Sequence, residues 1–102
     1  MERTENQVIA QDISPDEKMR LVCEAADETK AHDITVMDVR GQTIIADYFV
    51  ICTGTSVTHI QSIADRVQEK LDAVVHTRGT PRAKPQGDAQ SYWLILDYSD
   101  VI

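Results

Sequence analysis

The chain has 102 residues, of which 42% are hydrophobic and 26% are charged, and its formal net charge is −7 at pH 7. This length suffices for one small domain, which must bury about 60–70% of its unfolded surface. The acidic balance argues against nucleic-acid phosphates as direct ligands, because they require a concentrated Lys and Arg surface. An acidic surface suits a basic partner, or serves solubility alone. No run approaches the roughly 20 apolar residues of a membrane span and no signal peptide is recognisable, so we expect a cytoplasmic protein without membrane contact.

Residues 1–13 mix charged, amide and isolated apolar residues without a period, and they are predicted to form a mobile N-terminal arm. Residues 14–102 are predicted to form a single domain that begins with a helix. Ser14 suits the N-cap, Pro15 suits the first helical position, and Glu17 completes a capping box. We expect this helix to end near residues 31–32. Its inward face is predicted to carry Met19, Val22, Cys23 and Ala26.

A strand over residues 34–39 and a turn over residues 40–43 lead to the stretch around which the fold is expected to form. Residues 48–52 are an unbroken apolar, aromatic and β-branched run, which is typical of a central strand buried on both faces. Residues 54–56 combine a glycine that permits a tight turn with two hydroxyl residues suited to a helix N-cap. Apolar residues at steps of three and four then predict an amphipathic helix: Val57, Ile60, Ala64, Val67, Leu71 and Val74.

The C-terminal third is predicted to contain a long loop over residues 76–91, which is either functional or disordered, with disorder favoured. The loop carries a local positive spot: Arg78, Arg82 and Lys84. Residues 92–96 are predicted to form the next strand, residues 97–100 a tight turn, and residues 101–102 the start of a partner strand. Two residues do not complete a hairpin, so the open sheet edge invites pairing with another chain, and a homodimer of the free protein is a third alternative beside the two functions considered below. Together these elements predict an α+β fold, a mixed sheet flanked by helices.

The cysteines and histidines give no sign of a catalytic or metal site. Cys23 and Cys52 lie among apolar neighbours without a CxxC motif, so we expect buried thiols rather than a disulfide or a nucleophile. The three histidines share no metal-ligand spacing. We therefore predict no metal and no cofactor.

Several short motifs occur in a fixed order along the chain. They are Ala25-Ala26, Asp33-Ile34, Asp38–Gly41, Ala46–Ser56, His59, Ile63–Asp65 and Trp93–Ile102. In this order and spacing, from about Lys18 onward, the sequence resembles the Iojap family, also called ribosomal silencing factors. The resemblance implies a degenerate nucleotidyltransferase-like fold. It also implies that a C-terminal strand and helix beyond Ile102 are missing here, and that Ser99, where the family usually has Gly, gives the turn another type.

The resemblance also implies a function. Members of this family bind the large ribosomal subunit through its fourteenth protein, on the face that meets the small subunit. They thereby block association of the two subunits and repress translation when nutrients are scarce. For this chain the resemblance implies a non-catalytic translation repressor that acts by occupying the subunit interface.

Five residues are candidates for contact with the basic ribosomal protein. Trp93 and Tyr98 are the predicted anchors, because interface energy concentrates in a few large aromatic residues, and Trp93 aligns with a Trp of the family's ribosome-contact surface. Asp97 and Asp100 flank the turn and would meet Lys or Arg, while Asp47 is a weaker candidate. The alternatives are that Trp93 is a half-buried strand residue covering the sheet, that the turn acids bond their own backbone, and that Asp47 pairs with a local arginine.

The alternative function is that of a degenerate nucleotidyltransferase-like domain which binds a nucleotide as a regulatory ligand. The turn over residues 54–56 is similar to the Gly-Ser turn of those enzymes, in which amides at a helix N-terminus hold phosphate. Such enzymes also need paired carboxylates on a neighbouring strand to hold magnesium. Asp97 and Asp100 are instead three residues apart across a turn. We therefore expect no catalysis.

Overall fold

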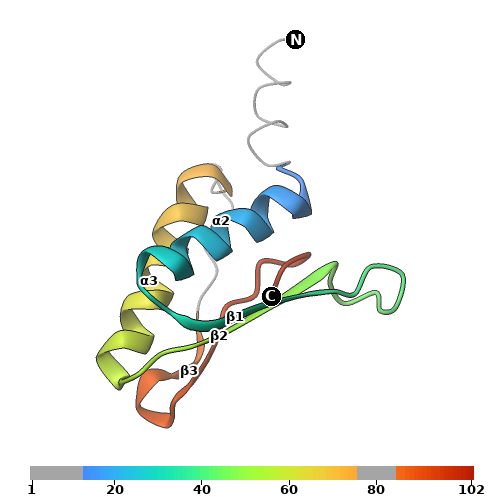
Figure 1. Cartoon of the computed structure of the whole chain (residues 1–102). Coiled ribbons are helices and arrows are strands. Elements are labelled where there is room, and N and C mark those ends of the chain that lie inside the picture. Colours follow the sequence, from blue (N-terminus) through green and yellow to red (C-terminus); the bar gives the residue numbers. More distant parts are fainter. Residues whose placement is uncertain (1–12, 76–84) are drawn as a thin grey trace.

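The computed structural model describes residues 13–75 and 85–102. The predicted N-terminal arm, apart from Ile13, and the predicted positive spot lie outside the described residues. The described elements are α2 (Pro15–Glu28), β1 (His32–Asp38), β2 (Tyr48–Thr53), α3 (Val57–Val75), β3 (Gln86–Asp88), the 3₁₀-helix η1 (Ala89–Ser91) and β4 (Trp93–Ile95). The two α-helices lie on one side of the β1–β2 ribbon (Figure 1). The α+β class is confirmed, whereas the nucleotidyltransferase-like detail stays a prediction.

Helix α2 begins where its sequence predicts and ends earlier than expected. The Ser14 hydroxyl accepts a hydrogen bond from the Glu17 amide at 3.1 Å, as an N-cap does. The helix stops at Glu28, because the Thr29 hydroxyl donates to the Ala25 carbonyl at 2.8 Å and Lys30 adopts a left-handed φ of 63°. The predicted end near residues 31–32 was therefore three to four residues too late.

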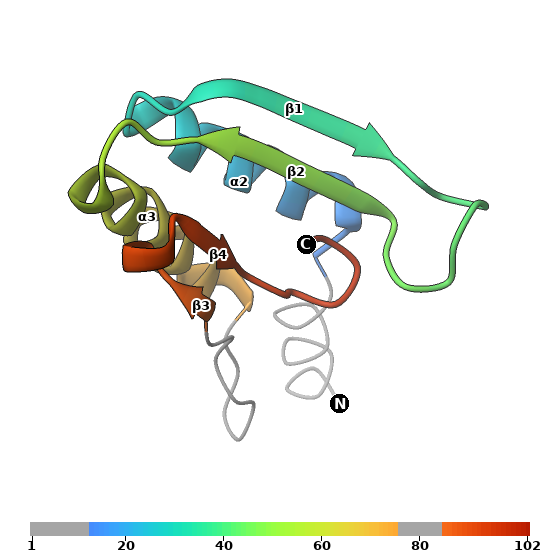
Figure 2. The same ribbon diagram turned by 90° about the horizontal axis from the view of Figure 1, so that it is seen from below.

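Strands β1 and β2 pair in antiparallel fashion, with Thr35 opposite Ile51 and Met37 opposite Phe49. The prediction that β2 is buried on both faces is wrong. Tyr48 is 5% exposed, but Ile51 is 53% exposed, because the helices cover only one face of the ribbon. Figure 2 shows β1 and β2 lying across α2, with β4 on the β2 side of the pair.

Strand β2 is nevertheless central, because residues 101–102 run along its other edge. Tyr48 and Val101 form a parallel bridge. The Val50 amide donates to the Ile102 carbonyl at 2.9 Å, and the Ile102 amide donates to the Tyr48 carbonyl at 3.1 Å. The predicted short strand at residues 101–102 therefore pairs with β2.

The hydrophobic core lies between α2, α3, β2 and the segment after β4. Its buried cluster comprises Ala25, Ile63, Val67, Leu71 and Tyr98. Half-buried Cys52 and Leu96 pack against this cluster from β2 and from the segment that follows β4. The predicted stripe of α3 is confirmed for Ala64, Val67 and Leu71, which are buried, but Val74 near the helix end is exposed.

The predicted loop over residues 76–91 is wrong from Gln86 onward. Residues 86–88 form β3, which pairs antiparallel with β4 and sets Gly87 opposite Leu94. Gly87 has a φ of 86°, and a Cβ at this position would lie 2.7 Å from the Trp93 carbonyl oxygen. The Asp88 carboxylate then accepts from the Ser91 amide at 2.9 Å and caps η1. Residues 86–91 have no hydrophobic period, because polar residues and local hydrogen bonds form this segment, and the sequence pattern therefore indicated a loop.

Both cysteines are free, as expected, but they are half-buried instead of buried, and this burial raises the pKa of each thiol. Within residues 13–75 and 85–102, no group of three or more His, Cys, Asp or Glu side chains is arranged to hold a metal ion. No helix in this part of the chain has the length and apolar character needed to cross a membrane.

Candidate partner-binding surface

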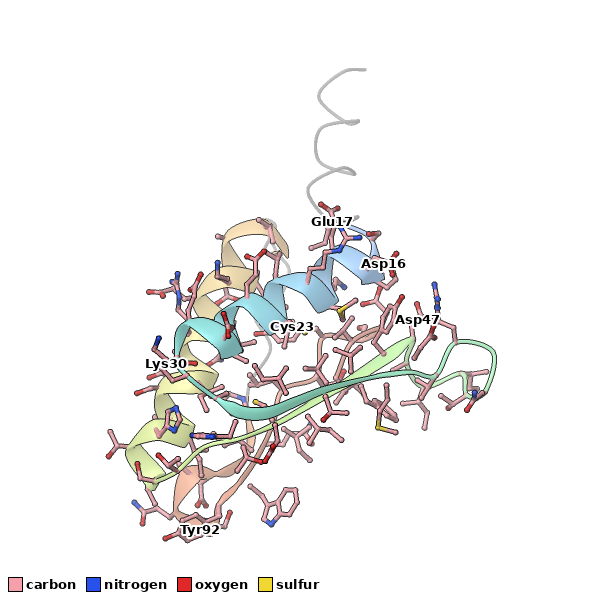
Figure 3. All side chains as sticks on the ribbon, in the orientation of Figure 1. Asp16, Glu17, Cys23, Lys30, Asp47 and Tyr92 are labelled. Carbon is pink, nitrogen blue, oxygen red and sulfur yellow. The ribbon has the colours of Figure 1, made fainter. Side chains whose placement is uncertain are left out.

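An exposed aromatic and aliphatic surface lies around β4. Trp93 is 75% exposed, and Ile95 on the same face of this strand is also exposed, whereas Leu94 between them is half-buried. Tyr92 precedes β4 in a left-handed conformation and projects at the end of the molecule away from α2 (Figure 3). Trp93 therefore does not cover the sheet, which was the alternative to its anchoring role.

Ile51 of β2 completes this surface. It is exposed, and it borders the same hollow as the three exposed residues around β4. We define the Trp93 surface as Ile51, Tyr92, Trp93 and Ile95. Contiguous exposed apolar side chains on a small domain mark interaction sites, because leaving them in water is unfavourable.

Tyr98 is not at the surface. It is 8% exposed and belongs to the core cluster, so the structure contradicts its expected place as an exposed anchor. Its hydroxyl is buried and has no hydrogen-bond partner in the described part of the chain. Burial, together with the negative charge of Asp72, raises the pKa of Tyr98 to about 12. The exposure of Tyr98 was predicted wrongly because a Tyr that follows an acid in a turn has the sequence pattern of an exposed residue.

The two turn acids differ in their roles. Asp97 is exposed and its carboxylate accepts from the Ser99 amide at 2.8 Å, which is the local turn bond anticipated as its alternative role. Asp100 pairs with Lys18 of α2, with 2.8 Å between Oδ1 and Nζ. Ser99 adopts a φ of 71°, so the serine accepts the left-handed conformation that Gly takes freely, and the expected change of turn type is not seen.

The Lys18 contact is largely enclosed. The Lys18 side chain is 10% exposed and that of Asp100 is 31% exposed. The Lys18 ammonium also donates to the Tyr98 carbonyl at 3.2 Å. The negative charge of Asp100 is therefore partly neutralised within the protein, and Lys18 fastens the C-terminal turn to α2.

Asp47 lies far from the Trp93 surface. Figure 3 places Asp47 and Tyr92 at opposite ends of the molecule. The Asp47 amide donates to the Asp100 carbonyl at 2.8 Å, so these two acids belong to the same end of the sheet. The local arginines pair with other acids: Arg40 with Asp38 at 2.7 Å, and Arg66 with Glu28 and Glu69. The five candidates therefore do not form one cluster.

Ile44 and Ile45 were not among the predicted site residues. Both are exposed, Ile44 completely, in the turn that leads into Asp47. The available signal was two adjacent β-branched apolar residues outside any alternating pattern. In the described part of the structure no other element covers them, and they face solvent. Their exposure makes the Asp47 end of the sheet a second apolar area.

The turn over residues 54–56 is occupied by internal hydrogen bonds. The Thr55 amide donates to His59 Nδ1 at 2.9 Å, and the Ser56 hydroxyl caps α3 by accepting from the His59 amide at 3.1 Å. His59 Nε2 lies 2.6 Å from the Thr29 carbonyl oxygen, so this histidine joins α3 to the end of α2. A Cβ on Gly54 would lie 2.8 Å from the Ile60 side chain. Because one amide of the expected phosphate cradle is already used, the turn gives the nucleotide alternative little support.

Comparison with known proteins identifies the family. The family model described as ribosomal silencing factor during starvation, RsfS, matches residues 12–102. The ribosomal silencing factor RsfS of Bacillus subtilis is 31% identical over 84 residues, which are 82% of this chain and 68% of that protein. RsfS of Haemophilus influenzae is 32% identical over 85 residues, which are 82% of this chain and 78% of that protein.

Solved structures agree with the sequence match. The crystal structure of a protein from Chromobacterium violaceum superposes with a TM-score of 0.74 at 27% identity, covering 87% of this chain and 71% of the other. A crystal structure from Bacillus halodurans gives a TM-score of 0.70 at 27% identity, covering 84% and 76% of the two chains. The chain therefore belongs to the RsfS family of ribosomal silencing factors.

Proposed function

We propose that this chain binds the large ribosomal subunit in the cytoplasm, blocks its association with the small subunit and so represses translation. The partner on the subunit is a basic ribosomal protein at the subunit interface. Family membership supports the ribosome as partner. The observation that carries the proposal is the 75% exposure of Trp93 at the centre of an apolar surface on an otherwise acidic chain.

The Trp93 surface supplies the apolar part of the contact. Interface energy concentrates in a few aromatic anchors surrounded by residues that exclude water. Trp93 is the anchor in this proposal, with Ile51 and Ile95 beside it. The position of Tyr98 in the core assigns it a supporting role, in which its ring holds the turn after β4 in place.

The acids supply charge complementarity. Asp97 is exposed and follows the Trp93 surface directly along the chain, so it is the acid best placed to meet Lys or Arg. Asp47 and Asp100 lie together at the other end of the sheet, and they contribute in this proposal through the negative field of that end. Contacts between exposed charges are screened over roughly 10 Å at 0.1 M salt. Binding should therefore weaken with salt while its apolar part persists.

Repression requires no chemistry in this proposal. The bound protein occupies space that the small subunit needs, so the extent of repression follows affinity and copy number. The supporting observation is that the Thr55 amide, in the turn at residues 54–56, is already bonded to His59 Nδ1. A titration with nucleoside triphosphate and magnesium tests the alternative, which requires perturbation of the Thr55 and Ser56 amides.

Co-sedimentation with purified large subunits tests the proposal. Trp93→Ala should weaken binding by about 2 kcal/mol or more, roughly 30-fold, because it truncates the central anchor. Asp27→Asn is the matched control, since Asp27 is exposed on α2 and lies outside the Trp93 surface. Equal binding of Trp93→Ala and the unaltered chain would remove Trp93 from the interface.

A further inference from the structure

The outer face of the β1–β2 ribbon, on the side away from both α-helices (Figure 1), carries an exposed methionine. Met37 is 43% exposed and lies directly opposite Phe49 of β2. The Tyr48 hydroxyl donates to the Asp16 carboxylate of α2, so Tyr48 faces the helices. Successive side chains of a strand point to opposite faces, so Phe49 and Ile51 point outward. Met37 shares this outer face, because residues opposite one another in a strand pair lie on the same side.

Met37 extends the Trp93 surface along the ribbon. Thr35, two residues before Met37 on the same face, is opposite Ile51, which belongs to that surface. Met37 and Ile51 are therefore diagonal neighbours on adjacent strands, and such neighbours lie about 7–8 Å apart, within reach of long side chains. A flexible, polarizable thioether suits a contact surface of this kind, because it adapts to an irregular partner.

The other methionine among the described residues has a different environment. Met19 lies on α2 and is half-buried, and its sulfur accepts a hydrogen bond from the Cys23 thiol at 3.9 Å. The third methionine of the chain, Met1, lies outside the described residues. Oxidation of methionine by a dissolved oxidant depends on exposure of the sulfur, so Met37 is the more susceptible of the two described methionines.

We propose that Met37 is an oxidation site, at which a peroxide converts the thioether to the sulfoxide and thereby weakens binding of the ribosomal partner. The Met37 sulfur attacks one oxygen of hydrogen peroxide, and the S–O bond forms while the O–O bond breaks. The second oxygen leaves as water, so the sulfur is oxidised and the peroxide reduced by two electrons. The inference rests on the proposed function, because it concerns the surface through which the chain would bind the large subunit.

The sulfoxide changes the outer face from apolar to polar at this position. Methionine sulfoxide is a polar, chiral side chain that disrupts methionine-containing interfaces, and methionine sulfoxide reductases reverse it. Its oxygen binds water in the free chain, and an apolar contact would remove that water without supplying a new partner. Met37 lies outside the buried core cluster, so the sulfoxide should weaken partner binding while the fold persists.

Peptide-resolved mass spectrometry of the whole chain during exposure to hydrogen peroxide tests the oxidation step. Met37 sulfoxide should form at least fivefold faster than Met19 sulfoxide, and equal rates would overturn the proposal. Peroxide also oxidises thiols, although burial raises the pKa of Cys23 and of Cys52 and so lowers their fraction of reactive thiolate. Met37→Leu is the matched control, because it conserves volume, removes the sulfur and leaves both cysteines in place.

Co-sedimentation with purified large subunits tests the effect on binding. The peroxide-treated chain should bind at least fivefold more weakly than the untreated chain, and methionine sulfoxide reductases should restore its binding. Met37→Leu should bind like the untreated chain before and after peroxide. Met37→Gln, which introduces a polar side chain of similar length, should bind at least fivefold more weakly without peroxide, while circular dichroism confirms its fold.

The outcomes separate this inference from the proposed function. Unchanged binding of the chain that carries Met37 sulfoxide would overturn the inference alone, and so would an equal loss of binding by Met37→Leu after peroxide. An untreated chain that does not bind large subunits would overturn the proposed function and the inference together.

Discussion

The enclosed ion pair between Lys18 and Asp100 should be the most sensitive polar contact of the fold. Replacing Lys18 by Met keeps most of the side-chain volume but removes the charge, leaving Asp100 and the Tyr98 carbonyl without their donor. Removing one partner of a fully buried pair costs about 3–5 kcal/mol. The Asp100 side chain is 31% exposed, so water compensates part of the loss and we expect about 2–3 kcal/mol. This is a large fraction of the roughly 5–15 kcal/mol that stabilises a typical domain.

A double-mutant cycle measured by urea unfolding isolates the pair. Lys18→Met, Asp100→Asn and the double variant should give a coupling energy of about 1–2 kcal/mol. The matched control is the cycle for Arg40 and Asp38, whose side chains are 54% and 50% exposed, with an expected coupling of about 0.2–1 kcal/mol. A coupling for Lys18 and Asp100 no larger than that of the control would refute the conclusion that Lys18 fastens the turn to α2.

Three further changes test the fold. Ser14→Ala should lower the free energy of unfolding by about 1 kcal/mol in urea, because the Glu17 amide loses its acceptor; an unchanged value would argue against the cap. Gly87→Ala should lower the melting temperature more than Gly41→Ala. Both glycines have positive φ, but only the Cβ at residue 87 meets backbone, so equal shifts would contradict the close approach to Trp93. Tyr98→Phe should raise the free energy of unfolding by about 1 kcal/mol, because it removes a buried hydroxyl without a partner. The raised pKa of Tyr98 means that the folded chain holds the hydroxyl proton more tightly than the unfolded chain does. The free energy of unfolding should therefore fall as pH rises from 10 toward 12, and Tyr98→Phe should abolish this fall.

The helices were predictable because their signals are local. The Ser14 cap and the apolar stripe of α3 each lie within a few residues of the structure that they specify. The end of α2 was missed because it depends on the Thr29 hydroxyl competing for helix carbonyls. The sheet was harder to predict, because β3 consists of polar residues and is specified by its pairing with β4.

The surface could be predicted only in part. The exposure of Trp93 agrees with an anchoring role, because a strand of three residues at the margin leaves its outer face uncovered. Tyr98 is buried because it packs against α3. Lys18 contacts the Tyr98 carbonyl and the Asp100 side chain across 80 or more positions in the sequence. No local pattern reports such contacts. The separation of Asp47 from Tyr92, which lie at opposite ends of the molecule in Figure 3, likewise emerges only in three dimensions.

Subunit joining in the presence of this chain is the decisive measurement for the proposed steric blockade. Purified large and small subunits are mixed with the chain or with Trp93→Ala, and the joined ribosomes are separated on a sucrose gradient. We expect the unaltered chain to lower the fraction of joined ribosomes, and Trp93→Ala to require roughly 30-fold more protein for the same effect. Full joining at saturating amounts of the unaltered chain would contradict repression by steric blockade.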